Sequence, residues 1–342
     1  MSLIKSISGF RGTIGGKPND NLTPIDIVKF ASAYGSWLKN KAPGPKKVVV
    51  GRDGRMSGEM VEALVEQCLL ALGIDVIHLG LSTTPTVEMA VVFEKADGGI
   101  ILTASHNPKQ WNALKLLNEK GEFVSAEEGK TILDLAANED FNYAAVDEMG
   151  KIIANEDSLT KHIEAIVSYP LVDIQAIKAA NFSVVVDAIN SSGAFSVPAL
   201  LNVIGVSNIK VLNAEMTGNF AHNPEPLKEN LTDLCNTVVK EKAHLGIAVD
   251  PDVDRLCFVS EDGELFGEEY TLVAIADYIL QHKKGATVSN LSSTRALRDI
   301  TEKHGCTYFA SAVGEVNVVT LMKNEKAVIG GEGNGGIIVP DL

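Results

Sequence analysis

The sequence has no long apolar run, no basic cluster and no paired cysteines. No stretch approaches the ~20 consecutive apolar residues of a membrane span, and residues 1–6 lack the apolar core of a signal peptide. We therefore expect a cytoplasmic protein that does not associate with membranes. Cys68, Cys235, Cys257 and Cys306 form no C-x-x-C pair, which indicates reduced, mostly buried thiols rather than a disulfide framework or a zinc site.

Positive charge is scarce. The 342 residues include 30 lysines and arginines against 44 acidic residues, a net charge of -14. This charge repels nucleic acids and anionic lipids, and the chain has no basic patch to bind either. A small anionic substrate remains compatible with it, since a metal ion and a few arginines can reverse the field locally. Protein partners stay unknown from the sequence.

Alternating apolar runs and amphipathic stretches predict an α/β fold. The sequence is 45% hydrophobic, which suits three domains of about 100 residues each. Each third has strand-like runs separated by a helix-like stretch, which predicts mostly parallel or mixed sheets. The expected strands are 47–50, 75–79, 99–102, 182–186, 209–212, 245–249 and 327–329, and the expected helices are 57–72, 194–204 and 268–281.

Two polar stretches predict the domain boundaries. The first is 136–148 and the second lies near 241–244, giving domains at 1–145, 146–242 and 243–342. The last residues, Pro340-Asp341-Leu342, directly follow a strand-like run. We therefore expect a C-terminal piece to be missing.

Three aspartates at alternate positions indicate a metal site in the segment Asp250-Pro251-Asp252-Val253-Asp254-Arg255. In an extended segment their carboxylates point the same way and repel one another unless a cation lies between them. A calcium EF-hand loop is excluded, because Arg255 stands where that loop needs glycine and the flanks resemble strands. A solvated acidic turn is the alternative. Magnesium would keep coordination positions for phosphate oxygens and water.

Ser105 lies in the loop-like segment Thr103-Ala104-Ser105-His106-Asn107-Pro108, after an apolar run. The simplest interpretation is a helix N-cap, and a hydroxyl nucleophile is the other. Ser105 and His106 do not form a hydrolase dyad, because adjacent side chains diverge and no G-x-S-x-G elbow is present. A phosphate on Ser105 would be a further ligand for the cation bound by the aspartates.

Two glycine-rich segments resemble nucleotide-binding loops without meeting their requirements. Residues 331–336 match G-x-G-x-x-G, but Ile337-Ile338-Val339-Pro340 cannot form the helix of a Rossmann site. Instead Glu332 and Asn334, on either side of Gly333, suit sugar hydroxyls. Residues 9–17 are no P-loop, because no glycine stands five positions before Gly16. Arg11 within them is either solvated or a phosphate clamp.

Taken together, these motifs resemble those of the α-D-phosphohexomutases. The residues that carry the resemblance, in the same order over the whole chain, are Arg11-Gly12, the T-A-S-H-N-P segment at 103–108, Asn112-Ala113-Leu114-Lys115, the D-P-D-V-D-R segment at 250–255 and the glycine-rich loop at 331–336. The family includes phosphoglucomutase, phosphomannomutase and phosphoglucosamine mutase, which are isomerases of carbohydrate metabolism.

The resemblance implies three similar domains around a central active-site cleft and a phosphoserine at Ser105. The serine donates its phosphoryl group to a hexose monophosphate and recovers another from the bisphosphorylated sugar, so a sugar 1,6-bisphosphate is the expected activator. Mg²⁺ is bound by Asp250, Asp252, Asp254 and the phosphoserine oxygen. The remaining implied roles are an acid/base role for Lys115 with help from His106, a grip on the phosphoryl group by Arg11 and Arg255, and sugar recognition by Glu332, Gly333 and Asn334.

The sequence departs from the family pattern in two respects. Nothing supplies the fourth domain, whose loop grips the remote phosphate, so we expect phosphorylation of Ser105 with slow turnover, if any. Gly333-Asn334-Gly335 replaces the Gln-Ser-Gly form of many phosphoglucosamine mutases, and Gly314-Glu315 stands where some members have Gly-His. These differences and the N-terminal segment Ile7-Ser8-Gly9 are compatible with glucosamine, glucose and mannose phosphates as substrates, and they slightly favour the hexosamine.

Two alternatives remain. A metal-dependent phosphatase with Asp250 as nucleophile would stay active without Ser105, and a truncated sugar-phosphate binding module would bind its ligand without turnover.

Overall fold

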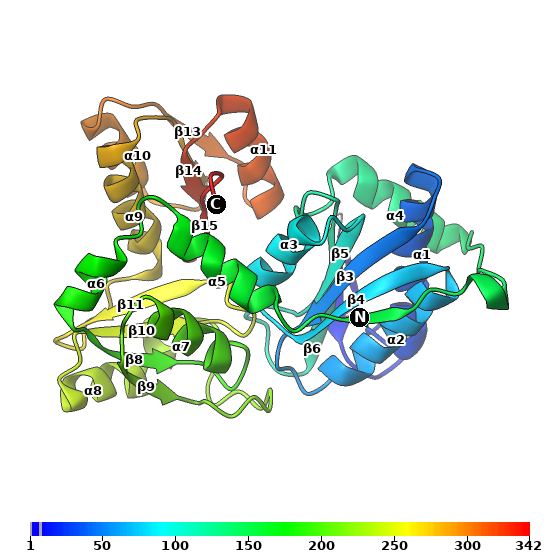
Figure 1. Cartoon of the computed structure of the whole chain (residues 1–342), viewed down its shortest axis with the longest axis horizontal. Helices are drawn as coiled ribbons and strands as arrows, with labels where there is room; N and C mark the ends of the chain where they lie inside the picture. The colour runs from blue at the N-terminus through cyan, green and yellow to red at the C-terminus, as the bar shows by residue number, and fades with distance from the viewer. Residues whose placement is uncertain (1, 7–8) are drawn as a thin grey trace. The chain divides into compact units, whose positions relative to one another are not determined.

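The chain folds into two compact units in the computed structural model, which describes residues 2–6 and 9–342. The first unit extends to His162 and also includes Asn190–Ser192 and Met216–Phe220. The second unit contains Ile163–Ile189, Gly193–Glu215 and Ala221–Leu342. Figure 1 follows the chain through both units.

The first unit is built on a seven-stranded mixed sheet with the order β1-β2-β6-β5-β3-β4-β7. Strands β5, β3, β4 and β7 pair in parallel, whereas β6, β2 and β1 join in antiparallel fashion. The strands are β1 (Ile4–Ser6), β2 (Gly9–Thr13), β3 (Lys46–Arg52), β4 (Ile74–Leu81), β5 (Gly98–Leu102), β6 (Trp111–Leu117) and β7 (Ile152–Ala154).

Helices cover both faces of this sheet (Figure 1). Successive strand residues point to opposite faces, so Val48 and Val50 of β3 pack with helices α1 (Pro24–Lys41), α2 (Gly58–Ala71) and α4 (Ala126–Asn138). Val49 packs with α3 (Thr84–Phe93) on the other face. The predicted helix at 57–72 is confirmed as α2, and Gly73 follows it with a φ of 77°.

The second unit contains two four-stranded mixed sheets. The first has the order β11-β10-β8-β9, with β11 antiparallel. Helix α8 packs on one face against Val185, and α7 packs on the other against Val184 and Val186. The elements of this part are α6 (Ile174–Ala180), β8 (Ser183–Asp187), α7 (Gly193–Val203), β9 (Asn208–Leu212), α8 (Thr232–Glu241), β10 (Leu245–Val249) and β11 (Leu256–Ser260), with a short 3₁₀ turn at Lys228–Asn230. Helix α5 (Ser158–Ser168) begins in the first unit and ends in the second, and a further 3₁₀ turn, Val146–Glu148, lies in the first unit.

The other sheet of the second unit has the order β13-β12-β14-β15, with β15 antiparallel. Helices α9 and α10 pack against Ile329, and α11 packs against Val288. The elements are α9 (Glu268–His282), β12 (Thr287–Asn290), α10 (Ala296–Lys303), β13 (Tyr308–Ser311), α11 (Glu315–Glu325), β14 (Ile329–Gly331) and β15 (Ile337–Ile338). Three α/β domains with mixed sheets are thus confirmed, while the central cleft stays a prediction.

Strand pairing differs from the expected domain limits at two places. Strand β7 pairs with β4 of the first sheet, although the sequence placed its residues after the first boundary. Strands β10 and β11 share a sheet with β8, although the sequence placed them after residue 242. Local composition predicts a strand but not its hydrogen-bonded neighbour. The domain limits themselves stay a prediction.

Helix length and polarity bear on membrane insertion. Across residues 2–6 and 9–342, every helix is too short or too polar to cross a membrane. Cys68 and Cys257 are buried, and Cys235 and Cys306 are partly exposed; all four are free thiols.

Candidate active site

Ser105 occupies a strained position just beyond β5. Its φ is 49°, in the left-handed region that non-glycine residues seldom adopt. The main-chain N–H of Ser105 donates to Thr103 Oγ1 at 2.9 Å, and Thr103 Oγ1 donates to Asp53 Oδ2 at 2.7 Å. Strain of this kind persists only where the surroundings hold it, and it is common at functional sites.

The buried side chain of Arg55 holds the loop that connects β5 to β6, residues 103–110, which we call the serine loop. Its Nε donates to Asp53 Oδ2 at 3.0 Å, and both side chains are inaccessible to solvent. Its two terminal nitrogens donate to the carbonyls of Ser105, Asn107 at 2.7 Å, and Pro108 and Trp111 at 2.9 Å each. The sequence analysis missed Arg55. The only local signal was the charged run Arg52-Asp53-Gly54-Arg55 directly after an apolar strand.

Three further predicted residues lie in the first unit. His106 Nδ1 is 3.4 Å from Ser105 Oγ, a weak contact between neighbouring side chains. Lys115, on β6, is half-buried with its Nζ 5.9 Å from the ring centroid of Phe123. Arg11, on β2, is exposed and pairs with Ala113. Because Ala113 and Lys115 are two residues apart, Arg11 and Lys115 share one face of the sheet.

Asp250, Asp252 and Asp254 converge in the loop between β10 and β11. One carboxylate oxygen from each lies within 4.8 Å of the others, and Asp250 and Asp252 are fully buried. The main-chain N–H groups of Asp254 and Arg255 both donate to Asp250 Oδ1 at 3.1 Å. Both flanks are strands, as the sequence predicted when it excluded an EF-hand.

The donor set of this loop fits a hard divalent cation. Carboxylates brought this close repel one another, and burial removes the water that would screen them. Magnesium and calcium take oxygen ligands of this kind. Val253 lies within this turn at a φ of 61°, which is uncommon for a β-branched residue.

Arg255 and the predicted sugar-recognition loop, residues 331–336 and called the sugar loop below, lie beside the aspartates in the second unit. Arg255 forms an ion pair with Glu225 at 3.4 Å. Leu256 N donates to Gly335 O at 3.3 Å, which ties the sugar loop to the start of β11. A side chain at Gly335 would place its Cβ 2.5 Å from Leu256 O, so only glycine permits this approach.

Glu332 organises the sugar loop. Its Oε1 accepts from Asn290 Nδ2 at 2.5 Å and from Gly314 N at 3.1 Å, and its Oε2 accepts from Asn334 Nδ2 at 3.4 Å. Asn334 Oδ1 accepts in turn from Gly336 N at 3.1 Å. The loop is followed by strand β15 at Ile337–Ile338, where a Rossmann site would need a helix, as the sequence predicted.

The sequence analysis also missed a histidine–aspartate pair at the end of β8. His222 Nε2 lies 3.0 Å from Asp187 Oδ2, and His222 Nδ1 lies 2.8 Å from Asn223 O. Both partners only accept, so both contacts are satisfied by the doubly protonated ring. Burial opposes that charge, but the hydrogen bond and the charge of Asp187 outweigh it and raise the pKa of His222.

The structure therefore assembles two groups of predicted residues. Ser105 and His106 meet in the first unit; the aspartates, Arg255 and the sugar loop meet in the second. A cation shared by Ser105 and the aspartates stays a prediction. Ile7 and Ser8 of the predicted substrate-selecting opening lie outside the described residues.

Family models match nearly the whole chain. They are the phosphoglucomutase/phosphomannomutase α/β/α domains I, II and III, at residues 4–143, 160–263 and 267–342. The chain belongs to the phosphoglucomutase/phosphomannomutase family. It is thus a phosphohexomutase-family enzyme, in the isomerase class, and its carboxylate cluster agrees with the metal dependence of that family.

Individual relatives agree with this assignment. A phosphoglucomutase/phosphomannomutase of Thermococcus kodakarensis is 37% identical over 97% of this chain and 73% of its own length. A protein of Methanopyrus kandleri, named probable phosphoglucosamine mutase, is 35% identical over 98% of this chain and 71% of its own. The crystal structure of a candidate phosphomannomutase from Thermus thermophilus superposes with a TM-score of 0.88 at 27% identity, covering 100% of this chain and 76% of that one.

Replacing Arg55 with lysine should loosen the serine loop. A single ammonium cannot reproduce the planar fork of N–H groups, and each buried carbonyl left without a donor costs about 1–3 kcal/mol. We expect amide hydrogen exchange in residues 103–111 to accelerate by more than about tenfold, since 1.4 kcal/mol corresponds to that factor. Mass spectrometry of the corresponding peptide measures it. Arg52→Lys is the matched control, because Arg52 contacts Glu59 and Glu62 instead; equal exchange in both variants would contradict the assignment.

The His222–Asp187 pair should stabilise the protein most at acidic pH. The folded-state pKa of His222 is raised above its unfolded value, so the stabilisation is complete below the unfolded value of about 6.5 and disappears as pH rises through the folded pKa. We expect His222→Asn to lower the Tm by about 2–4 °C near pH 5.5 and by less near pH 9. Scanning fluorimetry across this range measures the difference. His244→Asn is the control, since His244 Nδ1 accepts from Ser183 N and needs no charge. A pH-independent difference for His222→Asn would refute the charged pair.

Proposed function

We propose that this chain moves a phosphoryl group between C1 and C6 of a hexosamine or hexose phosphate through a phosphoserine at Ser105. The observation that carries this proposal is the strained, buried Ser105 held by Arg55. A helix N-cap, the simplest alternative, has extended φ/ψ and starts a helix. Residues 106–110 form a turn that leads into β6 instead.

The proposed transfer uses residues of the first unit. The bond between phosphorus and Ser105 Oγ breaks while phosphorus bonds to the free hydroxyl oxygen of the sugar. The hydroxyl proton passes to Lys115, with His106 as a helper, and Ser105 Oγ keeps the electron pair of the broken bond. In the returning step Ser105 Oγ bonds to the phosphorus of the other phosphoryl group, the bond from that phosphorus to its sugar oxygen breaks, and Lys115 gives its proton to that oxygen. Arg11, on the same sheet face as Lys115, would attract the phosphoryl oxygens.

Asp250, Asp252 and Asp254 would hold Mg²⁺ together with an oxygen of the phosphoserine. The burial of Asp250 and Asp252 and the approach of the three carboxylates to within 4.8 Å of one another support this role. Mg²⁺ supplies positive charge that offsets the charge developing on a transferred phosphoryl group. Arg255 would add a cationic contact at the edge of the same loop.

Glu332, Gly333 and Asn334 would recognise the sugar. The internal bonds of Glu332 hold its carboxylate in one orientation, which limits the ordering cost of binding. A carboxylate in a chain of net charge -14 favours the ammonium group of a hexosamine over a neutral hydroxyl. The name of the Methanopyrus kandleri relative also points to phosphoglucosamine.

Incubation with Mg²⁺ and glucose 1,6-bisphosphate should add one phosphate to the protein. Intact-mass measurement should detect it, peptide mapping should locate it at Ser105, and chelation of the metal should prevent it. Ser105→Ala should gain no phosphate. Ser82→Ala is the matched control: it changes a buried serine directly after β4, which β3 separates from β5, and should be labelled as well as the unchanged protein.

Three outcomes would contradict this proposal. Phosphate on Asp250, with activity retained in Ser105→Ala, would favour the phosphatase. Sugar-phosphate binding with no phosphate on the protein would favour the binding module. Label in Ser105→Ala at another serine would assign the nucleophile elsewhere.

Substrate preference should favour glucosamine phosphate. We expect kcat/KM to be higher for glucosamine 1-phosphate than for glucose or mannose 1-phosphate, because a charge-assisted hydrogen bond contributes more than a neutral one. Coupled assays with each sugar phosphate and catalytic sugar bisphosphate measure the order. A higher kcat/KM with glucose or mannose phosphate would overturn the preference and leave the phosphoserine chemistry intact.

A further inference from the structure

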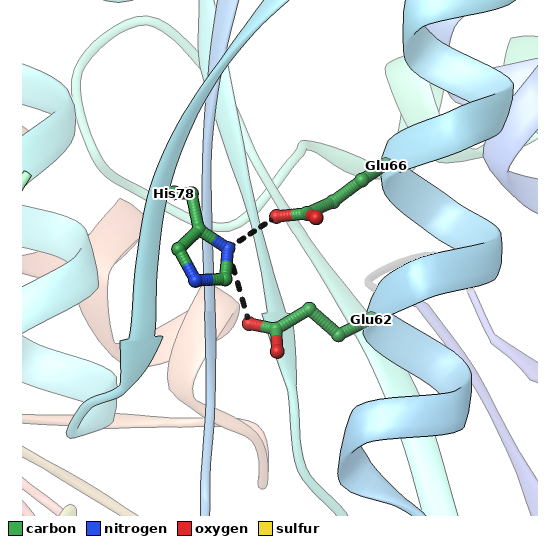
Figure 2. Close-up of side chains that lie close together, drawn as sticks. All are labelled: Glu62, Glu66 and His78. Atoms are coloured by element: carbon green, nitrogen blue, oxygen red, sulfur yellow. Dashed lines mark hydrogen bonds and ion pairs between the residues drawn. The ribbon is translucent and has the colours of Figure 1, made fainter. Parts of the chain in front are cut away.

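A second group of potential metal ligands lies in the first unit, apart from every residue assigned above. Glu62 and Glu66 stand one turn apart on α2, and His78 stands on β4. One ligand atom from each lies within 4.8 Å of the others. Figure 2 shows both carboxylates reaching from α2 toward the same side of the His78 ring, with Nδ1 facing both.

The distances suit a tetrahedral metal ion. His78 Nδ1 lies 2.6 Å from Glu66 Oε1 and 3.7 Å from Glu62 Oε1. Ligand atoms at about 2.0–2.1 Å from a tetrahedral Zn²⁺ are ~3.3 Å apart. The two separations from His78 Nδ1 lie on either side of that value, and the two glutamate oxygens lie within 4.8 Å of each other, so side-chain rotations would bring the three atoms to bonding positions.

An oxygen of Glu62 is left without a hydrogen bond. Glu62 is only 6% exposed, and its Oε1 has no hydrogen-bond partner among the described residues. Its Oε2 already accepts from Arg52 Nε at 2.9 Å. A buried acceptor without a donor costs about 1–3 kcal/mol. An ion pair between His78 and Glu66 satisfies those two residues and leaves Glu62 Oε1, which points at the ring, unexplained.

The charges around the cluster leave room for a cation. Glu62 and Glu66 are both buried, at 6% and 5% exposure, and Arg52 contacts Glu62, the exposed Glu59 and the carbonyl of Asp53. Two carboxylates therefore face one arginine and one histidine. The side chain of His78 is 36% exposed, so the cluster opens to solvent on that side and a water could complete the coordination.

We propose that Glu62, Glu66 and His78 form a binding site for one divalent transition-metal ion of the zinc type. A mixture of imidazole nitrogen and carboxylate oxygen favours Zn²⁺ and its neighbours over Mg²⁺ and Ca²⁺, which prefer oxygen ligands alone. The site is thus chemically distinct from the all-oxygen aspartate loop. A bound ion would displace the proton between His78 and Glu66, supply the missing partner of Glu62 Oε1, and clamp α2 to β4.

Cobalt and zinc binding to the full chain tests this site. Asp250→Asn/Asp252→Asn/Asp254→Asn removes the aspartate site, so any remaining binding reports on the cluster. In that background, metal-free protein should bind one equivalent of Zn²⁺ by calorimetry and give visible tetrahedral Co²⁺ bands. Adding Glu62→Gln or His78→Gln should weaken binding by more than tenfold, since losing even an outer-shell contact costs about ten- to a hundredfold.

Glu59→Gln is the matched control, because Glu59 lies on the same helix, is 87% exposed in its side chain, pairs with Arg52 and is not one of the three ligands of the cluster. It should bind Zn²⁺ like its background. Circular dichroism verifies that each variant is folded, and two different ligand variants guard against one that is not. The proposal is overturned if the aspartate-deficient protein binds no Zn²⁺, or if folded Glu62→Gln and His78→Gln bind it unchanged.

Discussion

One buried guanidinium determines the geometry of the serine loop. The chain leaves β5 without entering a helix, so several carbonyls of the loop have no secondary-structure partner. Arg55 reaches four of them, and Asp53 balances its charge while also accepting from Thr103. Because these bonds are made together, Ser105 can remain at a φ of 49°, which its own side chain disfavours. The strain at the proposed nucleophile is thus maintained by residues about fifty positions earlier in the chain.

In the second unit, burial and hydrogen bonds hold carboxylates in fixed positions in a similar way. Asp250 and Asp252 are fully buried, and main-chain N–H groups at Asp254 and Arg255 bond to Asp250. The sugar loop is held against the start of β11 through Gly335, and Glu332 is held by Asn290 and Gly314. The orientation of the Asp250 and Glu332 carboxylates is therefore set before any ligand arrives, and transition-state stabilisation by fixed charges requires such preorganisation.

Local periodicity predicted central strands and helices of each sheet but left others, such as α1 and β6, unpredicted. Helix α2 and strand β10 lie where apolar spacing placed them, and the strand-like flanks of the three aspartates correctly excluded an EF-hand. The failures involve partners distant in sequence. Strand β7 joins the first sheet and β10 joins β8, because pairing depends on which edges meet in space. Arg55 was missed because its partners are main-chain carbonyls, which any residue type supplies.

The sequence by itself determined the α/β class, the family resemblance and the identity of the motif residues, because periodicity and side-chain chemistry are local properties. Only the tertiary structure decided which groups meet: the Arg55 carbonyl contacts, the pairing of His222 with Asp187, and His78 opposite Glu62 and Glu66. The spacing of Glu62 and Glu66 shows in the sequence that they share a helix face. That a histidine on β4 faces them follows from packing α2 on the sheet, and no local pattern encodes that contact.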